Sequence, residues 1–332
     1  MLNTGKLDSD LLKKLVFDKI TYRSDDVKVR PGIGEDCAVM DFGQYECVMS
    51  TDPITSAIND IGRLAIHITC NDIASNGVQP LGIMLAVMLP EGTAEEDVAH
   101  IMGQAAETAG SLGVEIIGGH TEVTPAVKQP VIVSTAVGKT LSGGSQSGND
   151  MAAGDYIMVS KSVGLEGSGI IACDFGEQLK SVLTEDELER AVSFLDMVSV
   201  VKEGVAAGTV GTHGMHDITE GGIMGAIWEM CQIAHKGALV WEDEIPVEPE
   251  VKKICSHFDI DPMRLISSGA MVIVTPQDRK DDMLEAMKNA GVQCSIVGRI
   301  EEESFGIMRT SQKGTFEIEP PYADEIYKVV GK

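Results

Sequence analysis

Apolar residues follow two kinds of spacing along this chain, and stretches of each kind occur in turn. Residues 46–51 form a run of strand length, and residues 60–75 carry an apolar stripe at the spacing of a helix. The stripe consists of Ile61, Leu64, Ala65 and Ile68. The next position on it is Asp72, so an acidic residue stands where the pattern predicts a core residue.

Predicted strands and helices continue to alternate up to the end of the sequence. In the first half, strands are predicted over residues 82–89, 114–117 and 131–137, with a helix between the first two. The second half begins with a predicted strand over residues 156–160 and continues with further helices and strands. The spacing is irregular and shows no repeat of about 20 to 50 residues, which favours an α+β fold over a barrel or a solenoid.

A polar, glycine-rich stretch, LSGGSQSGNDMAAG, separates the two halves. It predicts two domains, residues 1–145 and residues 150–332.

Acidic residues dominate the charge of the chain. Its 332 residues include 51 Asp and Glu against 26 Lys and Arg, a net charge of −25. Such a chain repels nucleic acid and anionic lipid, so neither is expected as a partner. Seven cysteines without a C-x-x-C pair, no signal peptide and no apolar run of about 18 residues predict a cytoplasmic protein.

Three aspartates at the ends of predicted elements are candidates for metal binding. Asp36 follows two glycines and Asp52 follows a strand, where turns and helix caps are the commoner explanations. Asp72 is more informative, because a buried carboxylate costs several kcal/mol unless it is paired or metal-bound. The three side chains together would suit Mg²⁺, which prefers oxygen ligands and bridges nucleotide phosphates.

Two glycine pairs mark further candidate sites. Gly118 and Gly119 are expected to end a strand and to expose backbone amides beside His120 and Thr121. A lone histidine is more often a core residue, but this setting favours a site. In the second half, Asp217 precedes a glycine pair that opens a helix, whose N-terminus would bind an anion or be capped by Asp217. P-loop, Rossmann and G-x-S-x-G motifs are absent from the sequence.

Taken in order, several segments resemble the ATP-dependent, PurM-like superfamily of AIR synthase, thiamine-monophosphate kinase, selenophosphate synthetase and the hydrogenase maturation protein HypE. The segments are GIGEDCAVM, STD, DIGRLAIHITCNDIASNGVQPLGI, GGHTEV and MHDITEGG. The long third segment is the specific one. The segment KSVGLEGSGIIA is most similar to the HypE-like, AIR synthase-related branch.

The resemblance implies two α+β domains, with the N-terminal sheets of two subunits pairing into a barrel and ATP bound at that dimer interface. It also implies that ATP phosphorylates a substrate oxygen, often that of a carboxamide on a small molecule or a protein, with a maturation protein as a further partner. Carried over by position, Mg²⁺ and ATP would be held by Asp36, Asp52, Asn71, Asp72, Gly118, Gly119 and Thr121. Catalytic roles would fall to His120 and Asp217.

The chain departs from this pattern at two places. Several relatives carry an acid where this chain has His120, so Glu122 or His120 would have to replace a metal ligand. HypE ends in a cysteine that carries the carbamoyl group, whereas the last cysteine here is Cys294, in a predicted strand. A HypE-like enzyme without the cysteine-tail chemistry is therefore expected, with a kinase of the thiamine-monophosphate type or a non-catalytic nucleotide-binding assembly protein as the alternatives.

Overall fold

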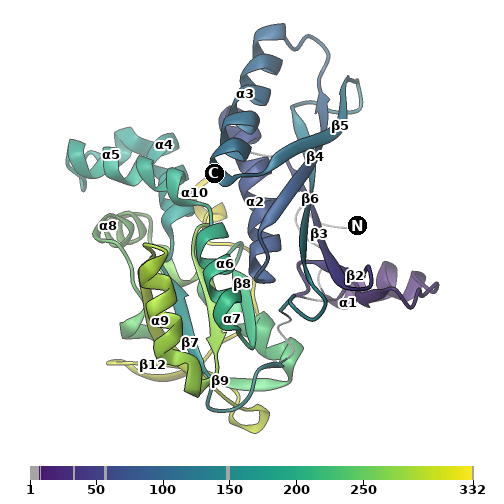
Figure 1. The fold of residues 1–332 in the computed structure, drawn as a ribbon. Coiled ribbons are helices and arrows are strands. Elements are labelled where there is room, and N and C mark those ends of the chain that lie inside the picture. Colours follow the sequence, from purple (N-terminus) through teal and green to yellow (C-terminus); the bar gives the residue numbers. More distant parts are fainter. Residues whose placement is uncertain (1–6, 8, 33, 56–57, 147–149, 331–332) are drawn as a thin grey trace.

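The strands of the protein form two β-sheets, which occupy different parts of the molecule in Figure 1. The computed structural model describes residues 7, 9–32, 34–55, 58–146 and 150–330. The first sheet has the order β1-β2-β3-β6-β4-β5, and the second has the order β13-β12-β9-β11-β7-β10-β8. The strands of the first sheet are β1 (Val27–Val29), β2 (Ala38–Asp41), β3 (Tyr45–Ile54), β4 (Pro80–Leu89), β5 (Glu115–Val123) and β6 (Val131–Leu141). Those of the second are β7 (Tyr156–Ser160), β8 (Gly214–Asp217), β9 (Lys236–Trp241), β10 (Met271–Thr275), β11 (Cys294–Glu302), β12 (Ile307–Ser311) and β13 (Gly314–Glu317).

Helices cover the two sheets differently. Helices α2 and α3 pack on one face of the first sheet, whereas the second sheet has α7 on one face and α6 with α9 on the other. Strands β7 and β10 are consequently buried on both faces, which explains their almost continuous apolar sequences. The helices are α1 (Ser9–Leu15), α2 (Ile61–Ser75), α3 (Glu95–Leu112), α4 (Leu165–Leu179), α5 (Glu185–Ser193), α6 (Val201–Val210), α7 (Gly222–Ala234), α8 (Pro249–Phe258), α9 (Lys280–Asn289) and α10 (Tyr327–Val330).

The arrangement confirms the predicted α+β class. The strand predicted over residues 46–51 lies within β3, and the helix predicted over residues 60–75 is α2. The predicted domain boundary falls partly on residues 147–149, which lie outside the described residues. Within the described ranges, none of the helices combines the length and the apolar character needed to span a bilayer.

Helix α2 lies between the first sheet and the second half of the chain, and this position explains why nearly all of its residues are buried. One side packs on β3 and β6. Another side faces the segment that leads into α6, where Arg63 donates to the carbonyl of Leu195. A helix buried on two sides positions its side chains rigidly, and Asp72 is one of them.

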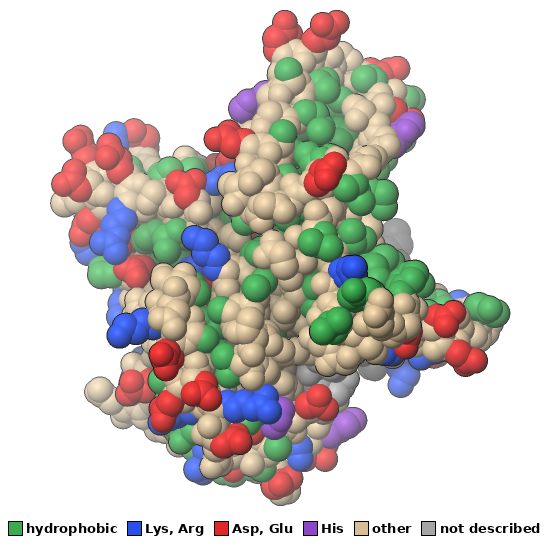
Figure 2. All heavy atoms as spheres, viewed as in Figure 1, with side chains coloured by type: hydrophobic (Ala, Val, Ile, Leu, Met, Phe, Trp, Pro, Cys, Tyr) green, Lys and Arg blue, Asp and Glu red, His purple; other side chains and the backbone are tan. Residues whose placement is uncertain are grey.

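The second face of the first sheet is open, with no helix of the described chain packed on it in Figure 1. The side chains on this face are nevertheless largely apolar. On β4, Leu81 and Met84 are exposed, and on β6 Val131, Val133 and Val137 are only half-buried. Figure 2 shows hydrophobic side chains gathered over the region of β4 and β5. Exposed apolar surface of this kind is typical of a face that another molecule covers.

Candidate active site

Four aspartates from both halves of the chain meet beside α2. Asp36 precedes β2, Asp52 lies on β3, Asp72 lies on α2, and Asp217 is the last residue of β8. Burial raises the pKa of the Asp72 carboxyl well above its usual value, and the charges of Asp217, Asp36 and Asp52 raise it further. The four carboxyl groups therefore form one electrostatically coupled cluster.

The donors around the cluster do not satisfy all of its oxygens. The hydroxyl of Ser50 lies 2.5 Å from Oδ2 of Asp72 and donates a hydrogen bond to it. Oδ2 of Asp52 is buried and has no hydrogen-bond partner among the described residues. A buried carboxylate oxygen without a donor is costly unless a cation is bound or a neighbouring carboxyl such as Asp72 shares its proton with Asp52. The oxygen-rich set fits Mg²⁺, which is bound through carboxylates and substrate phosphates.

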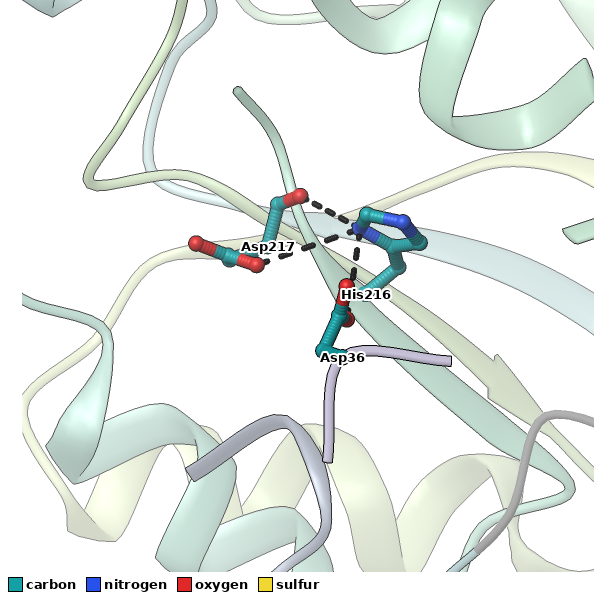
Figure 3. Close-up of side chains that lie close together, drawn as sticks. All are labelled: Asp36, His216 and Asp217. Atoms are coloured by element: carbon teal, nitrogen blue, oxygen red, sulfur yellow. Dashed lines mark hydrogen bonds and ion pairs between the residues drawn. The ribbon is translucent and has the colours of Figure 1, made fainter. Parts of the chain in front are cut away.

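His216 on β8 supplies a positive charge next to these carboxylates (Figure 3). Its Nδ1 donates to the backbone carbonyl of Asp217 at 2.6 Å and lies 3.9 Å from a carboxylate oxygen of both Asp36 and Asp217. Its Nε2 lies 3.6 Å from Oε2 of Glu229. Burial alone lowers the pKa of His216, but the three carboxylates outweigh it and raise the pKa to about 9.

After loss of its proton, His216 would complete a set of atoms that could ligate a metal ion. One atom each from Asp36, His216 and Asp217 lie within 4.8 Å of one another. His216 is not among the site residues predicted from the sequence. Its only sequence signal is its place directly before Asp217 in the segment MHD.

The glycine-rich segment of β5 differs from its prediction. Gly118 and Gly119 do not end the strand, because β5 continues to Val123 and pairs with β4 in parallel along its length. Gly119 has φ +147°, and a Cβ there would lie 1.9 Å from the carbonyl oxygen of Leu85. Glycine at this position therefore permits the close pairing of β5 with β4.

Within one chain, the β5 segment lies apart from the aspartates. Asp52 pairs with Ser134 on β6, Ser134 with Leu85 on β4, and Leu85 with Gly119 on β5. Three interstrand spacings of about 4.8 Å place Gly119 about 14 Å from Asp52. His120 and Thr121 are exposed, and Nε2 of His120 lies 3.3 Å from Oε2 of Glu122. The structure brings the four aspartates together, but not the β5 residues with them.

Asn71, which was expected beside the phosphates, faces the second half of the chain. Its Nδ2 donates to the carbonyl of Val198 at 2.8 Å, and its Oδ1 accepts from the N–H of Val200 at 2.9 Å. The side chain is fully buried. Both ends of the amide group are therefore engaged by backbone groups.

The N-terminus of α7, the expected anion site, is occupied by another part of the chain. The carboxylate of Asp324 accepts from the N–H of Gly221 at 2.7 Å, from that of Ile266 at 3.2 Å and from that of Ile326 at 2.9 Å. Asp217 is the last residue of β8.

Comparisons with known proteins agree with this architecture. Residues 34–140 match the N-terminal domain of AIR synthase related protein, and residues 152–309 match its C-terminal domain. A putative hydrogenase expression/formation protein of Methanocaldococcus jannaschii is 28% identical over 98% of this chain and 97% of its own length. Carbamoyl dehydratase HypE of Bradyrhizobium diazoefficiens is 30% identical over 77% of this chain and 74% of its own length.

Solved structures show the same fold. A chain in a HypE–HypF complex superposes with a TM-score of 0.76 at 24% identity, covering 94% of this chain and 99% of that chain. HypE in complex with ATP superposes with a TM-score of 0.73 at 22% identity, covering 97% of each chain. The matches and the geometry define a two-domain α+β protein with a carboxylate-rich site between its domains. The chain belongs to the AIR synthase-related family.

Proposed function

We propose that the protein is a Mg²⁺- and ATP-dependent enzyme of the HypE-like branch that activates the oxygen of a carboxamide by phosphorylation. The observation that carries the proposal is the cluster of Asp36, Asp52, Asp72 and Asp217, which both domains build and which leaves a buried carboxylate oxygen of Asp52 without a donor. The names of the relatives support the chemistry, since one is a carbamoyl dehydratase and another was solved with ATP.

The aspartates have separate tasks in this proposal. Asp36, Asp52 and Asp72 would hold Mg²⁺ and, through it, the ATP phosphates, while Asp217 faces them from the second domain. Bound Mg²⁺ would neutralise phosphate charge and orient the γ-phosphate for transfer. His216 holds a proton between Asp36 and Asp217, which limits the repulsion between these carboxylates before the metal binds.

Cys37 and Cys294 are poorly suited to carry the carboxamide. The thiol of Cys37, the cysteine nearest the cluster in sequence, donates to the carbonyl of Asp72, and burial raises its pKa. Cys294 lies in β11, and burial raises its pKa to about 12. We propose that the carboxamide arrives on a small molecule or on a maturation partner protein, a role consistent with the solved HypE–HypF complex.

The proposal includes a homodimer in which residues 1–145 form the dimerisation and nucleotide-binding domain. The open apolar face of the first sheet is the surface that a second copy would cover. A dimer would also give His120, Thr121 and the glycine pair a role, because β5 of the second copy would bring them to the aspartates. Within one chain, about 14 Å separates these groups.

Calorimetry with ATP tests the metal and nucleotide assignment. The protein should bind ATP with Mg²⁺ and lose this affinity in EDTA, because a chain of charge −25 with clustered acids repels bare triphosphate. Asp72→Asn should lose Mg-ATP binding at least tenfold. Asp281→Asn, which removes the same charge from an exposed side chain, is the matched control. Equal ATP affinity with and without Mg²⁺ would refute the assignment.

Turnover and assembly need separate measurements. ATP hydrolysis should rise when a carbamoyl compound is added and should stay low with thiamine monophosphate. Stimulation by thiamine monophosphate instead would identify a kinase.

Light scattering at micromolar concentration should give twice the chain mass, and a value near 35.4 kDa would contradict the dimer.

A further inference from the structure

Asn71 joins the two domains directly beside the carboxylate cluster. Its amide group bridges the carbonyl of Val198 and the N–H of Val200, and the residue that follows it is Asp72. The planar amide matches a carbonyl and an N–H at the same time, so it holds the segment 198–200 in one register relative to α2.

A short chain of contacts leads from this segment to Asp217. The ammonium group of Lys161 donates to the carbonyls of Ser199 and Gly269 at 2.6 Å each, and it therefore fixes the segment to the residues before β10. Two residues further on, Met271 begins β10 and pairs with Asp217 on β8. The segment 198–200 therefore contacts Asn71 directly. Through Lys161 it is also linked to the residues before β10, whose Met271 pairs with Asp217.

We propose that Asn71 is a positioning residue, which sets the distance between Asp72 of the first domain and Asp217 of the second so that one Mg²⁺ can use carboxylates from both. The inference rests on the proposed Mg²⁺ site and extends it by adding Asp217 to the ligands Asp36, Asp52 and Asp72. Residues that orient metal ligands without touching the metal typically affect metal affinity by 10- to 100-fold when they are replaced. Asn71 has both of its polar atoms on backbone groups, so its effect is transmitted through position.

The test compares Asn71 with another link between α2 and the second domain. Arg63 donates to the carbonyl of Leu195 at 3.0 Å and to Asp196 at 2.8 Å, so it joins the same two parts of the protein. It lies nine residues before Asp72, which is about 14 Å along the helix axis. Arg63→Met keeps the apolar stem and removes the link far from the cluster.

Mg²⁺ affinity of the full chain is measured by calorimetry with the metal alone, and the melting temperature is measured in EDTA. Asn71→Ala should lower the melting temperature and raise the Mg²⁺ dissociation constant about tenfold. Arg63→Met should lower the melting temperature but change the dissociation constant less than twofold. If Asn71→Ala does not fold, Asn71→Ser carries the test, because its short hydroxyl cannot bridge both backbone groups.

The Asp72→Asn variant distinguishes a failure of the positioning role of Asn71 from a failure of the proposed Mg²⁺ site. Loss of Mg²⁺ binding in Asp72→Asn together with parental affinity in the folded Asn71 variants would overturn the positioning role alone. An equal loss of affinity in Arg63→Met would overturn it as well, because the effect would then come from any loosening of the interface. Parental Mg²⁺ affinity in Asp72→Asn would instead refute the metal site of the proposed function.

Discussion

Replacing His216 should change how the stability of the metal-free protein depends on pH. The imidazole lies between Asp36, Asp217 and Glu229, and its pKa rises from the usual 6.5 to about 9. This difference corresponds to about 3 kcal/mol of preference for the protonated form, since a tenfold change in proton affinity is worth about 1.4 kcal/mol. The folded protein binds this proton more tightly than the unfolded chain does.

The sign of the effect follows from that preference. The stabilisation is fully present below pH 6.5 and is lost as the pH rises to about 9. About half of this stabilisation of about 3 kcal/mol is lost between pH 6.5 and pH 8. In the proposed site, bound Mg²⁺ would supply positive charge next to the same carboxylates, so the pH dependence should flatten when the metal is added.

Urea unfolding in EDTA at several values between pH 6.5 and pH 8 measures this slope. The parent should lose unfolding free energy across the range, whereas His216→Gln should be less stable at pH 6.5 and should lose less than the parent, because only other groups such as Asp72 still titrate. His100→Gln, at an exposed position of α3, is the control and should keep the parental slope. The reasoning fails if His216→Gln loses stability as steeply as the parent, or if Mg²⁺ leaves the parental slope unchanged.

Three further outcomes are expected. Gly119→Ala should lower the melting temperature by about 10 °C or more, because its Cβ would meet the Leu85 carbonyl, whereas Gly118→Ala, with open space there, should cost less. Burial alone raises the pKa of Glu46, but the hydrogen bonds from Lys28, Gly143 and Ser145 together outweigh it and lower the pKa to about 2. Urea unfolding should therefore show a larger loss of stability between pH 4.5 and pH 2 in the parent than in Glu46→Gln, because Asp41 and Glu187, whose pKa values are also lowered, remain in the variant. Intact mass measurement after incubation with a carbamoyl-transfer partner protein, carbamoyl phosphate and ATP should show no cysteine adduct.

The sequence predicts best the parts of the site that interrupt a periodic pattern. Asp72 could be recognised because an acid replaced a core residue on a helical stripe, and the structure places it in the buried cluster. His216 gave no such signal, since β8 is short and buried at every position. Its significance comes from Asp36, which approaches it from a segment far away in the sequence.

The length of β5 illustrates a different limit. A glycine pair usually weakens a strand, so the sequence predicted that the strand would end before Gly118. The structure continues it because β4 lies close enough to pair with the backbone and leaves no room for a side chain at Gly119. Local propensity cannot show such a requirement, because the constraint belongs to the neighbouring strand.

The carboxylate of Asp324 at the start of α7 bears on which anions the protein can recognise. This side chain already accepts hydrogen bonds from the backbone N–H groups of Gly221, Ile266 and Ile326. It therefore takes the place that a phosphate would otherwise occupy at the helix N-terminus. Free phosphate or pyrophosphate would have to displace a side chain that is anchored by three backbone groups. Discrimination against the small inorganic anions of the cell would then be built into the chain itself, and only a phosphate that arrives with its own metal would find a place at the aspartates.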